Sequence, residues 1–362
     1  MKVLVAPLDW GLGHATRCVP IIETLLKNGV EVVLGTCGSL KHFYSEAFPS
    51  LQQVDLPSYG IVYPTHGFQM PAWILSQLPR LHSIIEEEQR CVENLVSTLG
   101  ISAVISDNRF GAYSNRVPSV YITHQLRIAF PFASRFLETI GVHFHAAKML
   151  KFSEIWIPDL EEFPGFAGRL SHQKLHRPCH YIGPLSRFMN IAGNAKIPSP
   201  EKRYRFLGMV SGVEPMRTKL ETLLRETFAK IPGEHALLLG KPSSSIEKER
   251  FGNVTLFSHL SKEKFQNLVQ ESEYFISRPG YSTIMDQSFL GSNCLFIPTP
   301  GQTEQIYLGK ILAKFKYARV VEERNLNAEY LASAFEGPIY RLPKSNLGLL
   351  ENTISAFMEQ LK

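Results

Sequence analysis

The late stretch Ser277-Arg-Pro-Gly-Tyr-Ser-Thr-Ile-Met-Asp286 combines residue types that could hold a phosphorylated ligand. Three apolar residues just before it predict a short buried strand, and the pattern from 281 to 290 predicts a helix. Free backbone N–H groups at the start of such a helix favour anions such as phosphate. Asp286 lies about one and a half turns into this helix. Its carboxylate could there accept hydrogen bonds from a pair of hydroxyl groups.

A second strand-turn-helix unit follows directly, with a buried strand from Asn293 to Pro298 and a helix from about Thr303 to Phe315. Two such units in series bring two helix N-termini to the same edge of a parallel sheet. That edge is where open α/β sheets bind ligands. The two turns together therefore predict a phosphate site.

We expect this edge to stabilise a diphosphate through backbone N–H groups, helix ends and an arginine. The contributing residues would be Ser211, Gly212, Gly280 and Tyr281, with Arg278 or Arg217. The alternative is that the segment after Ser211 is a plain strand-to-helix turn and that Arg278 forms a surface salt bridge.

Near the N-terminus, a loop containing Gly11 and Gly13 follows the first strand and ends in His14. Histidine suits a general base because its pKa starts near the working pH. Asp107 ends another strand of the same predicted sheet and could hold the tautomer of His14, while Asp9 is the alternative partner. A structural role, with His14 capping the first helix or bonding a loop, is the other possibility. The glycine spacing is not GxGxxG, which argues against a dinucleotide site.

Further polar side chains stand where strands of the first sheet end. We expect them, with Gly11 and Gly13, on the side of an acceptor substrate: Asn108, Arg109, His124 and Gln125. The alternative is that these groups pair with one another, since buried polar groups are usually satisfied in this way.

The elements that position these residues form two α/β domains. Residues 1–185 predict about seven strands alternating with helices, and residues 186–345 start the same alternation again after a linker. A final amphipathic helix within 346–362 could return to the first domain. Two such domains predict a cleft between them, which is a preferred location for ligand sites.

Composition narrows the functional classes. The chain has 362 residues and a net charge of +5, which is too weak a balance to indicate nucleic-acid binding. Five scattered cysteines without a CxxC pair favour reduced thiols, and no run approaches the ~18 apolar residues of a membrane span. We therefore expect a cytoplasmic protein that could touch the inner face of a membrane.

Two further groups of side chains admit a functional interpretation that we do not favour. Histidines at 143, 145, 172, 176 and 180 are closely spaced, but Pro178 interrupts them and no carboxylate accompanies them, so we expect no metal site. An apolar set could face a lipid or form core: Trp73, Leu75, Phe130, Phe132, Phe136 and Phe144.

The combination of Gly-x-Gly-His in the first loop with Arg-x-Gly-x-x-Thr-x-x-Asp and Pro-x-x-Gln in the second domain resembles the GT-B glycosyltransferases. It is most similar to the family 28-like branch that contains the bacterial enzyme adding N-acetylglucosamine to a lipid-linked muramyl peptide. The resemblance covers nearly the whole chain. It implies two Rossmann-like domains facing each other across a cleft, a nucleotide-diphospho-sugar donor, inversion and no bound metal.

Residue by residue, the resemblance implies that His14 lies beside the acceptor and that Asp286 holds the ribose hydroxyls. It assigns the donor sugar to the turn of Thr303, Glu304 and Gln305, and the neighbouring donor contacts to Ser282 and Thr283. Ile306 stands where the family has an additional glutamine, so the sugar preference does not carry over.

We therefore predict an enzyme of cell-envelope biosynthesis that transfers a sugar from a nucleotide donor, expected to be a UDP-sugar, to a hydroxyl. The resemblance suggests a lipid-linked saccharide or a polysaccharide as the acceptor. Two alternatives remain: a nucleotide-sugar epimerase or hydrolase on the same fold, and a non-catalytic protein that binds nucleotide sugars.

Overall fold

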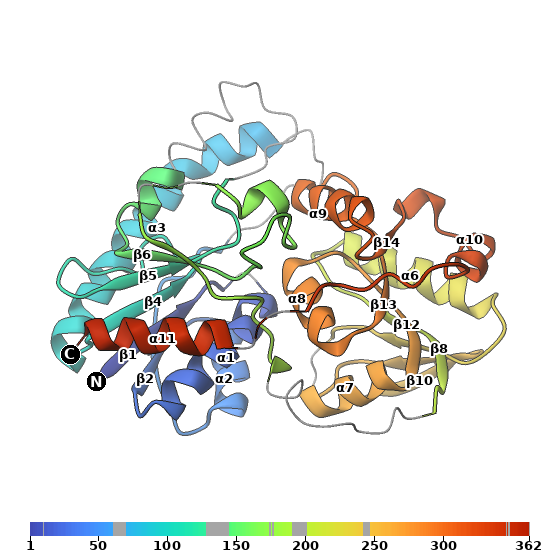
Figure 1. The fold of residues 1–362 in the computed structure, drawn as a ribbon, viewed down its shortest axis with the longest axis horizontal. Helices are drawn as coiled ribbons and strands as arrows, with labels where there is room; N and C mark the ends of the chain where they lie inside the picture. Colours follow the sequence, from blue (N-terminus) through green and yellow to red (C-terminus); the bar gives the residue numbers. More distant parts are fainter. Residues whose placement is uncertain are drawn as a thin grey trace. The chain divides into compact units, whose positions relative to one another are not determined.

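The structure is a computed structural model that describes the chain except for residues 10, 61–69, 128–144, 174, 176, 190–200, 242–246, 345, 347 and 362, and the side chains of 70–76 and 78. The chain forms two compact units. One consists of Met1–Arg187 with Ser345–Lys362, and the other of Phe188–Lys344. Each unit contains a seven-stranded sheet with helices packed against it (Figure 1).

The sheet of the first unit is parallel, with the strand order β3-β2-β1-β4-β5-β6-β7. A parallel pair needs a long crossover connection, which the alternating helices provide. The strands are β1 (Lys2–Pro7), β2 (Glu31–Thr36), β3 (Gln52–Asp55), β4 (Ala103–Asp107), β5 (Ser119–Ile122), β6 (Glu154–Ile157) and β7 (Cys179–Tyr181). The helices that pack in this unit include α1 (Leu12–Lys27), α2 (Ser39–Ala47), α3 (Met70–Leu99) and α11 (Gly348–Gln360).

The C-terminal helix α11 belongs to the first unit although it follows the second in sequence (Figure 1). The buried ring of Phe357 meets the buried ring of Trp156 edge-on, with 5.6 Å between the centroids. At the surface, Lys27 of α1 donates to Glu351 at 2.7 Å. Removal of apolar surface from water, rather than the exposed ion pair, provides most of the attachment.

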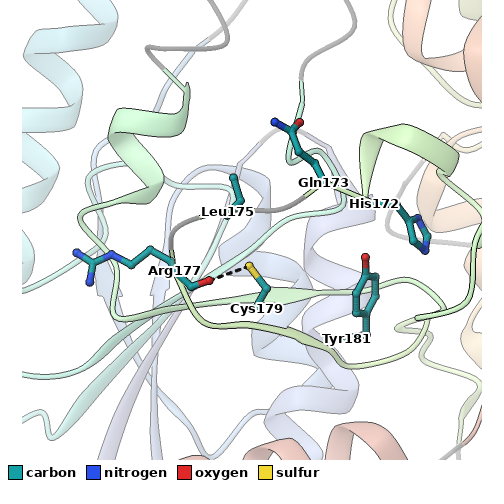
Figure 2. A pocket seen from close by; sticks show the side chains of 6 residues that line it. All are labelled: His172, Gln173, Leu175, Arg177, Cys179 and Tyr181. Atoms are coloured by element: carbon teal, nitrogen blue, oxygen red, sulfur yellow. Dashed lines mark hydrogen bonds between the residues drawn. The ribbon is translucent and has the colours of Figure 1, made fainter.

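A cavity of about 420 Å³ lies beside β7 (Figure 2). The thiol of Cys179 donates to the carbonyl of Arg177 at 3.3 Å, and the rings of His172 and Tyr181 are 5.3 Å apart. The lining residues are His172, Gln173, Leu175, Arg177, Cys179 and Tyr181. None of them is a residue that the sequence singles out for sugar transfer.

The sheet of the second unit has the order β10-β11-β9-β8-β12-β13-β14. All its pairs are parallel except β10 with β11. The strands are β8 (Tyr204–Met209), β9 (His235–Leu238), β10 (Lys248–Phe251), β11 (Val254–Phe257), β12 (Ser272–Ser277), β13 (Asn293–Phe296) and β14 (Arg319–Val320). The helices are α6 (Met216–Ala229), α7 (Lys262–Gln270), α8 (Tyr281–Leu290), α9 (Thr303–Lys314) and α10 (Ala328–Ser333), with a short 3₁₀ turn η3 (Glu323–Asn325).

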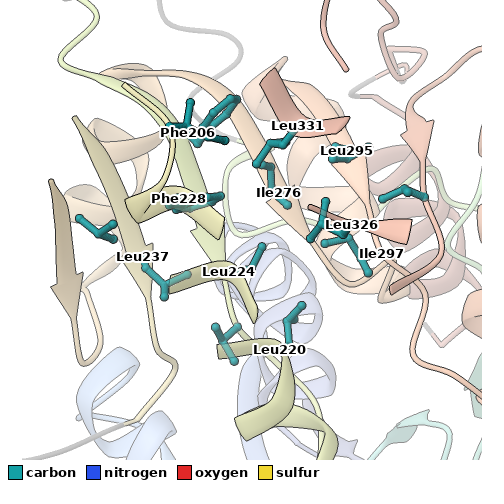
Figure 3. Close-up of a cluster of buried hydrophobic side chains, with 14 of the residues drawn as sticks. Phe206, Leu220, Leu224, Phe228, Leu237, Ile276, Leu295, Ile297, Leu326 and Leu331 are labelled. Carbon is teal, nitrogen blue, oxygen red and sulfur yellow. The ribbon is translucent and has the colours of Figure 1, made fainter. Parts of the chain in front are cut away.

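The core of the second unit forms where α6 packs on the sheet (Figure 3). Leu220, Leu224 and Phe228 recur every four residues, so they lie on one face of α6 and are fully buried. Phe206 of β8 stacks on Phe228 with centroids 5.6 Å apart and on His235 at 5.1 Å. This packing fixes the strands whose ends carry the predicted donor site.

The predicted strands and helices agree with the described structure within a few residues, with two exceptions that matter. The first helix begins at Leu12 rather than Ala15, so His14 lies inside its first turn. Strand β10 was not predicted, because Lys-Glu-Arg-Phe is exposed along its whole length and shows no apolar alternation.

Arg278, directly after β12, is buried and connects three segments of the second unit. Its guanidinium donates to the carbonyls of Ile297 at 3.0 Å and Pro298 at 3.2 Å, and it forms an ion pair with Glu323 in η3. Burial disfavours the charged form and lowers the pKa of Arg278, while Glu323 works in the opposite direction. The arginine therefore depends on Glu323 for charge compensation.

Replacing Glu323 with Gln should lower the free energy of unfolding by about 1–3 kcal/mol, because it weakens the compensation of a buried charge. The control is Glu322→Gln, since the neighbouring side chain is 65% exposed and should matter by less than about 0.5 kcal/mol. Urea denaturation of both variants measures the difference. Equal stability of the two variants would contradict this role for Glu323.

Candidate functional site

The first part of the site is built where β1, β4 and β5 end side by side. Pro7 of β1 pairs with Asp107 of β4, and Asp107 pairs with Ile122 of β5. The chain then turns through Gly11, whose φ of 83° suits glycine, into the first turn of α1. This turn places His14 above the end of β4.

His14 and Asp107 are hydrogen-bonded partners. Nδ1 of His14 lies 3.0 Å from Oδ2 of Asp107, whose side chain is fully buried, while the imidazole remains 16% exposed. If Nδ1 carries the proton that the carboxylate accepts, Nε2 keeps a lone pair. Among the residues that the structure describes, no hydrogen bond to Nε2 is present. The geometry is that of a base held in one tautomer by a carboxylate.

Arg17, one turn further along α1, contacts the same carboxylate. Its Nε donates to Oδ2 of Asp107 at 2.7 Å, and its Nη2 donates to Oδ1. The side chain of Arg17 is 2% exposed. Asp107 therefore contacts both a buried cation and an imidazole.

This arrangement shifts both titrations. Burial would raise the pKa of Asp107, but Arg17 and His14 outweigh it and hold that pKa well below its usual range. Burial and the charge of Arg17 together lower the pKa of His14, against the opposing effect of Asp107. The imidazole is therefore neutral near pH 7, as a general base must be.

Asp9, the alternative partner, is used elsewhere. It accepts from the hydroxyl of Ser58 and lies 3.9 Å from Nη1 of Arg109. Of the two carboxylates considered for His14, the structure places Asp107 within hydrogen-bond distance.

Arg109 is a correction to the expected acceptor side. It is fully buried and pairs with the buried carboxylate of Glu88 in α3, and it donates to the carbonyl of Pro7 at 3.2 Å. Tyr59 donates to the same Glu88 at 2.6 Å. Because these contacts occupy its guanidinium inside the unit, Arg109 supports the loops around the site rather than meeting a substrate.

The other expected acceptor-side groups remain near the strand ends. Asn108 adopts a φ of 58° and donates its N–H to Ile122 at 3.2 Å. His124, two residues beyond the end of β5, is buried. Nε2 of Gln125 is 3.5 Å from Nε2 of His124. Gly13 lies in the first turn of α1, and its carbonyl accepts from Thr16 at 3.2 Å.

In the second unit, three loops meet at one edge of the sheet. Ser277 of β12 pairs with Met209 of β8 and with Phe296 of β13. Because all three strands are parallel, the segments after them emerge side by side. The expected donor segments are therefore brought to the same edge.

The segment after β8 is exposed at Gly212, whose φ of 106° requires glycine, and half-buried at Ser211. Arg217, in the first turn of α6, pairs with Glu214 at 3.0 Å and donates to the carbonyl of Leu239. Arg217 therefore lies at this edge of the sheet, with its charge partly compensated by Glu214.

Arg278 is the second correction. The expectation was a ligand for the diphosphate or a surface salt bridge, but its guanidinium is buried among the carbonyls and the Glu323 carboxylate described above. It shapes the turn before α8 and offers no exposed charge to an anion.

Helix α8 starts directly after the turn that follows β12. Gly280 is the N-cap in an extended conformation and has no side chain that could cap the helix. The first residues, Tyr281, Ser282 and Thr283, are buried or half-buried, and Asp286 is half-buried in the second turn.

The start of α9 is braced by glutamines. The side chain of Gln302 accepts from the N–H of Gln305 at 2.5 Å, and the side chain of Gln305 accepts from Thr299 at 2.9 Å. Thr303 and Glu304 are half-buried in the same turn. Gln305 therefore stabilises the turn with its side-chain oxygen.

Three other expectations, on a metal site, a membrane span and an apolar set, can be compared with only the part of the chain that the structure describes. Within the described residues, no group of three His, Cys, Asp or Glu side chains is placed to hold a metal. Likewise, no helix in that part of the chain is long and apolar enough to cross a membrane. His143, His176 and the expected apolar set at 73, 75, 130, 132, 136 and 144 lie outside the described residues or side chains.

Sequence reasoning missed Arg17. The available signal was its position three residues after His14, which puts both side chains on one face of a helix. A buried Asp107 also requires a positive partner. The predicted start at Ala15 hid this relation, because it left His14 in a loop.

Comparison with known proteins adds a family match in the second unit. Residues 244–341 match the glycosyltransferase family 28 C-terminal domain. A UDP-N-acetylglucosamine--N-acetylmuramyl-(pentapeptide) pyrophosphoryl-undecaprenol N-acetylglucosamine transferase of Rickettsia felis is 31% identical over 105 residues, which is 28% of each chain. An uncharacterized glycosyltransferase of Methanosarcina mazei is 23% identical over 349 residues, covering 89% of this chain and 86% of that one.

Solved structures match along the whole chain. The glycosyltransferase SnogD from Streptomyces nogalater has a TM-score of 0.65 at 16% identity and covers both chains completely. The kitacinnamycin glycosyltransferase has a TM-score of 0.66 at 13% identity, covering 99% of this chain and 94% of that one. The expectation of a GT-B type glycosyltransferase is confirmed by this fold together with the family 28 C-terminal domain.

Proposed function

We propose that this glycosyltransferase moves a sugar from a nucleotide-diphospho-sugar to an acceptor hydroxyl, with His14 as the general base. The observation that carries the proposal is the hydrogen bond between His14 and the buried Asp107 at the end of β4. His14 takes the proton of the acceptor hydroxyl at Nε2, while Asp107 holds the tautomer and stabilises the imidazolium that forms.

The donor is assigned to the second unit, at the edge shared by β8, β12 and β13. The start of α8, where the N-cap is a glycine, and the segment at Ser211 and Gly212 offer backbone N–H groups to the diphosphate, in place of a bound metal. Asp286 accepts from the ribose hydroxyls. Thr303, Glu304 and Gln305 contact the sugar.

Attack by a deprotonated hydroxyl on the sugar in one displacement inverts the anomeric centre. The family 28 match and the Rickettsia relative support a UDP-sugar and a lipid-linked saccharide acceptor. The pairing of His14 with Asp107 favours catalysis over mere nucleotide-sugar binding, since a binding protein needs no such base.

Replacing His14 with Ala should lower the rate of sugar transfer about 10²–10⁴-fold, because the acceptor proton loses its base. Nucleotide binding should stay unchanged, since the donor site is in the other unit. His42→Ala is the matched control, with a side chain that is 82% exposed. Donor consumption and calorimetric binding separate the two effects. A His14→Ala enzyme with wild-type turnover would end the general-base assignment.

The pH dependence of kcat/KM should have an acid limb below pH 6.5. The pKa of His14 is lowered from 6.5 by burial and by Arg17, so the imidazole loses its proton, and gains basic function, at lower pH than an ordinary histidine. A rate profile measured from pH 4.5 to 8 tests this. An acid limb above pH 6.5 would show that another group controls the rate.

Changing Asp286 to Asn should weaken nucleotide binding about 10–100-fold, because hydrogen bonds to a charged acceptor contribute about 1.5–3 kcal/mol. Glu336→Gln, an exposed carboxylate of the same unit, is the control and should bind normally. Calorimetry with uridine diphosphate gives the comparison. Unchanged affinity in Asp286→Asn would remove this residue from the donor site.

A further inference from the structure

Arg17 and His14 share one buried carboxylate, and both contact its Oδ2. Asp107 accepts from both Nε and Nη2 of Arg17, from Nδ1 of His14 at 3.0 Å, and from the thiol of Cys18 at 3.6 Å. The carboxylate is fully buried, so no water replaces these donors. The forked contact makes Arg17 the main charge partner of Asp107.

This sharing has a consequence for the base. A buried carboxylate next to an imidazole favours the protonated ring, which cannot accept a proton from a substrate. The guanidinium compensates the charge of Asp107 and repels a second positive charge on the ring. Asp107 can therefore orient His14 without holding it in the charged form.

The other titratable groups around His14 do not take over this role. Cys18 of α1, Tyr44 of α2 and Tyr121 of β5 stay neutral, because burial raises the pKa of each. Asp9, in the loop before α1, faces Arg109. His124, after β5, adds a further repulsion when it is charged. Arg17 is the permanent cation in contact with the pair.

We propose that Arg17 is a positioning residue that keeps His14 neutral by compensating the negative charge of Asp107. The importance of this arrangement for catalysis rests on the proposed function of His14. The effect of Arg17 on the titration of His14 can be measured independently of that function, since the titration can be followed without turnover.

The test is an NMR titration of the imidazole C–H resonances in the full-length protein, with His14 identified as the signal missing from His14→Gln. In Arg17→Met the pKa of His14 should rise by about one to three units, because the compensating charge is gone. Arg17→Lys retains the charge and should stay close to wild type. Asp107→Asn should shift the pKa downward. The acid limb of kcat/KM should move to higher pH in Arg17→Met.

An unchanged pKa of His14 in folded Arg17→Met would overturn the inference and leave Arg17 a purely structural partner of Asp107. If Arg17→Met does not fold, Arg17→Gln takes its place, because the amide can still donate a hydrogen bond to the buried carboxylate of Asp107 but carries no charge. The pKa of His14 must rise in this variant too, and an unchanged pKa overturns the inference. Loss of the shift leaves the His14→Ala result untouched, so the two proposals fail separately.

Discussion

The buried carboxylate of Asp107 is the constraint on which the first unit depends. A charge at the end of β4 without solvent must be compensated, and α1 supplies the compensating cation, Arg17, and a further hydrogen-bond partner, His14, within its first two turns. The position of α1 is fixed in turn by β1 and by the glycine at its start. The fold thus places an imidazole where it is oriented by a negative charge and kept neutral by a positive one.

In the second unit, we expect backbone groups rather than charged side chains to meet the charge of a ligand. Three parallel strands end together, and the following segments present turns with one glycine each and helix starts at one edge. Among the described residues, Arg278 is the only arginine directly in the turn before α8. Its guanidinium is bonded to internal carbonyls and to Glu323. Anion binding there would depend on N–H groups and helix ends, which need no charged side chain.

Sequence patterns were sufficient for the parallel strands of the two α/β sheets, because buried parallel strands and their helices leave strong apolar periodicity, but not for the exposed antiparallel strand β10. They also identified His14 with Asp107, since both residues follow from the rule that parallel strands end at one edge. Arg109 and Arg278 were misjudged because exposure cannot be read from a single arginine. Their roles depend on Glu88 and Glu323, which lie 21 and 45 residues away in sequence.

The most direct measurement of the central claim is a thermal-shift series with nucleoside diphosphates and nucleotide sugars. A ligand at 100-fold its dissociation constant adds about 2.7 kcal/mol to the free energy of unfolding. We expect uridine diphosphate or its sugar derivatives to raise the Tm, because we propose that the edge of β8, β12 and β13 holds the diphosphate. A series in which no uridine, guanosine or thymidine diphosphate changes the Tm would contradict the account.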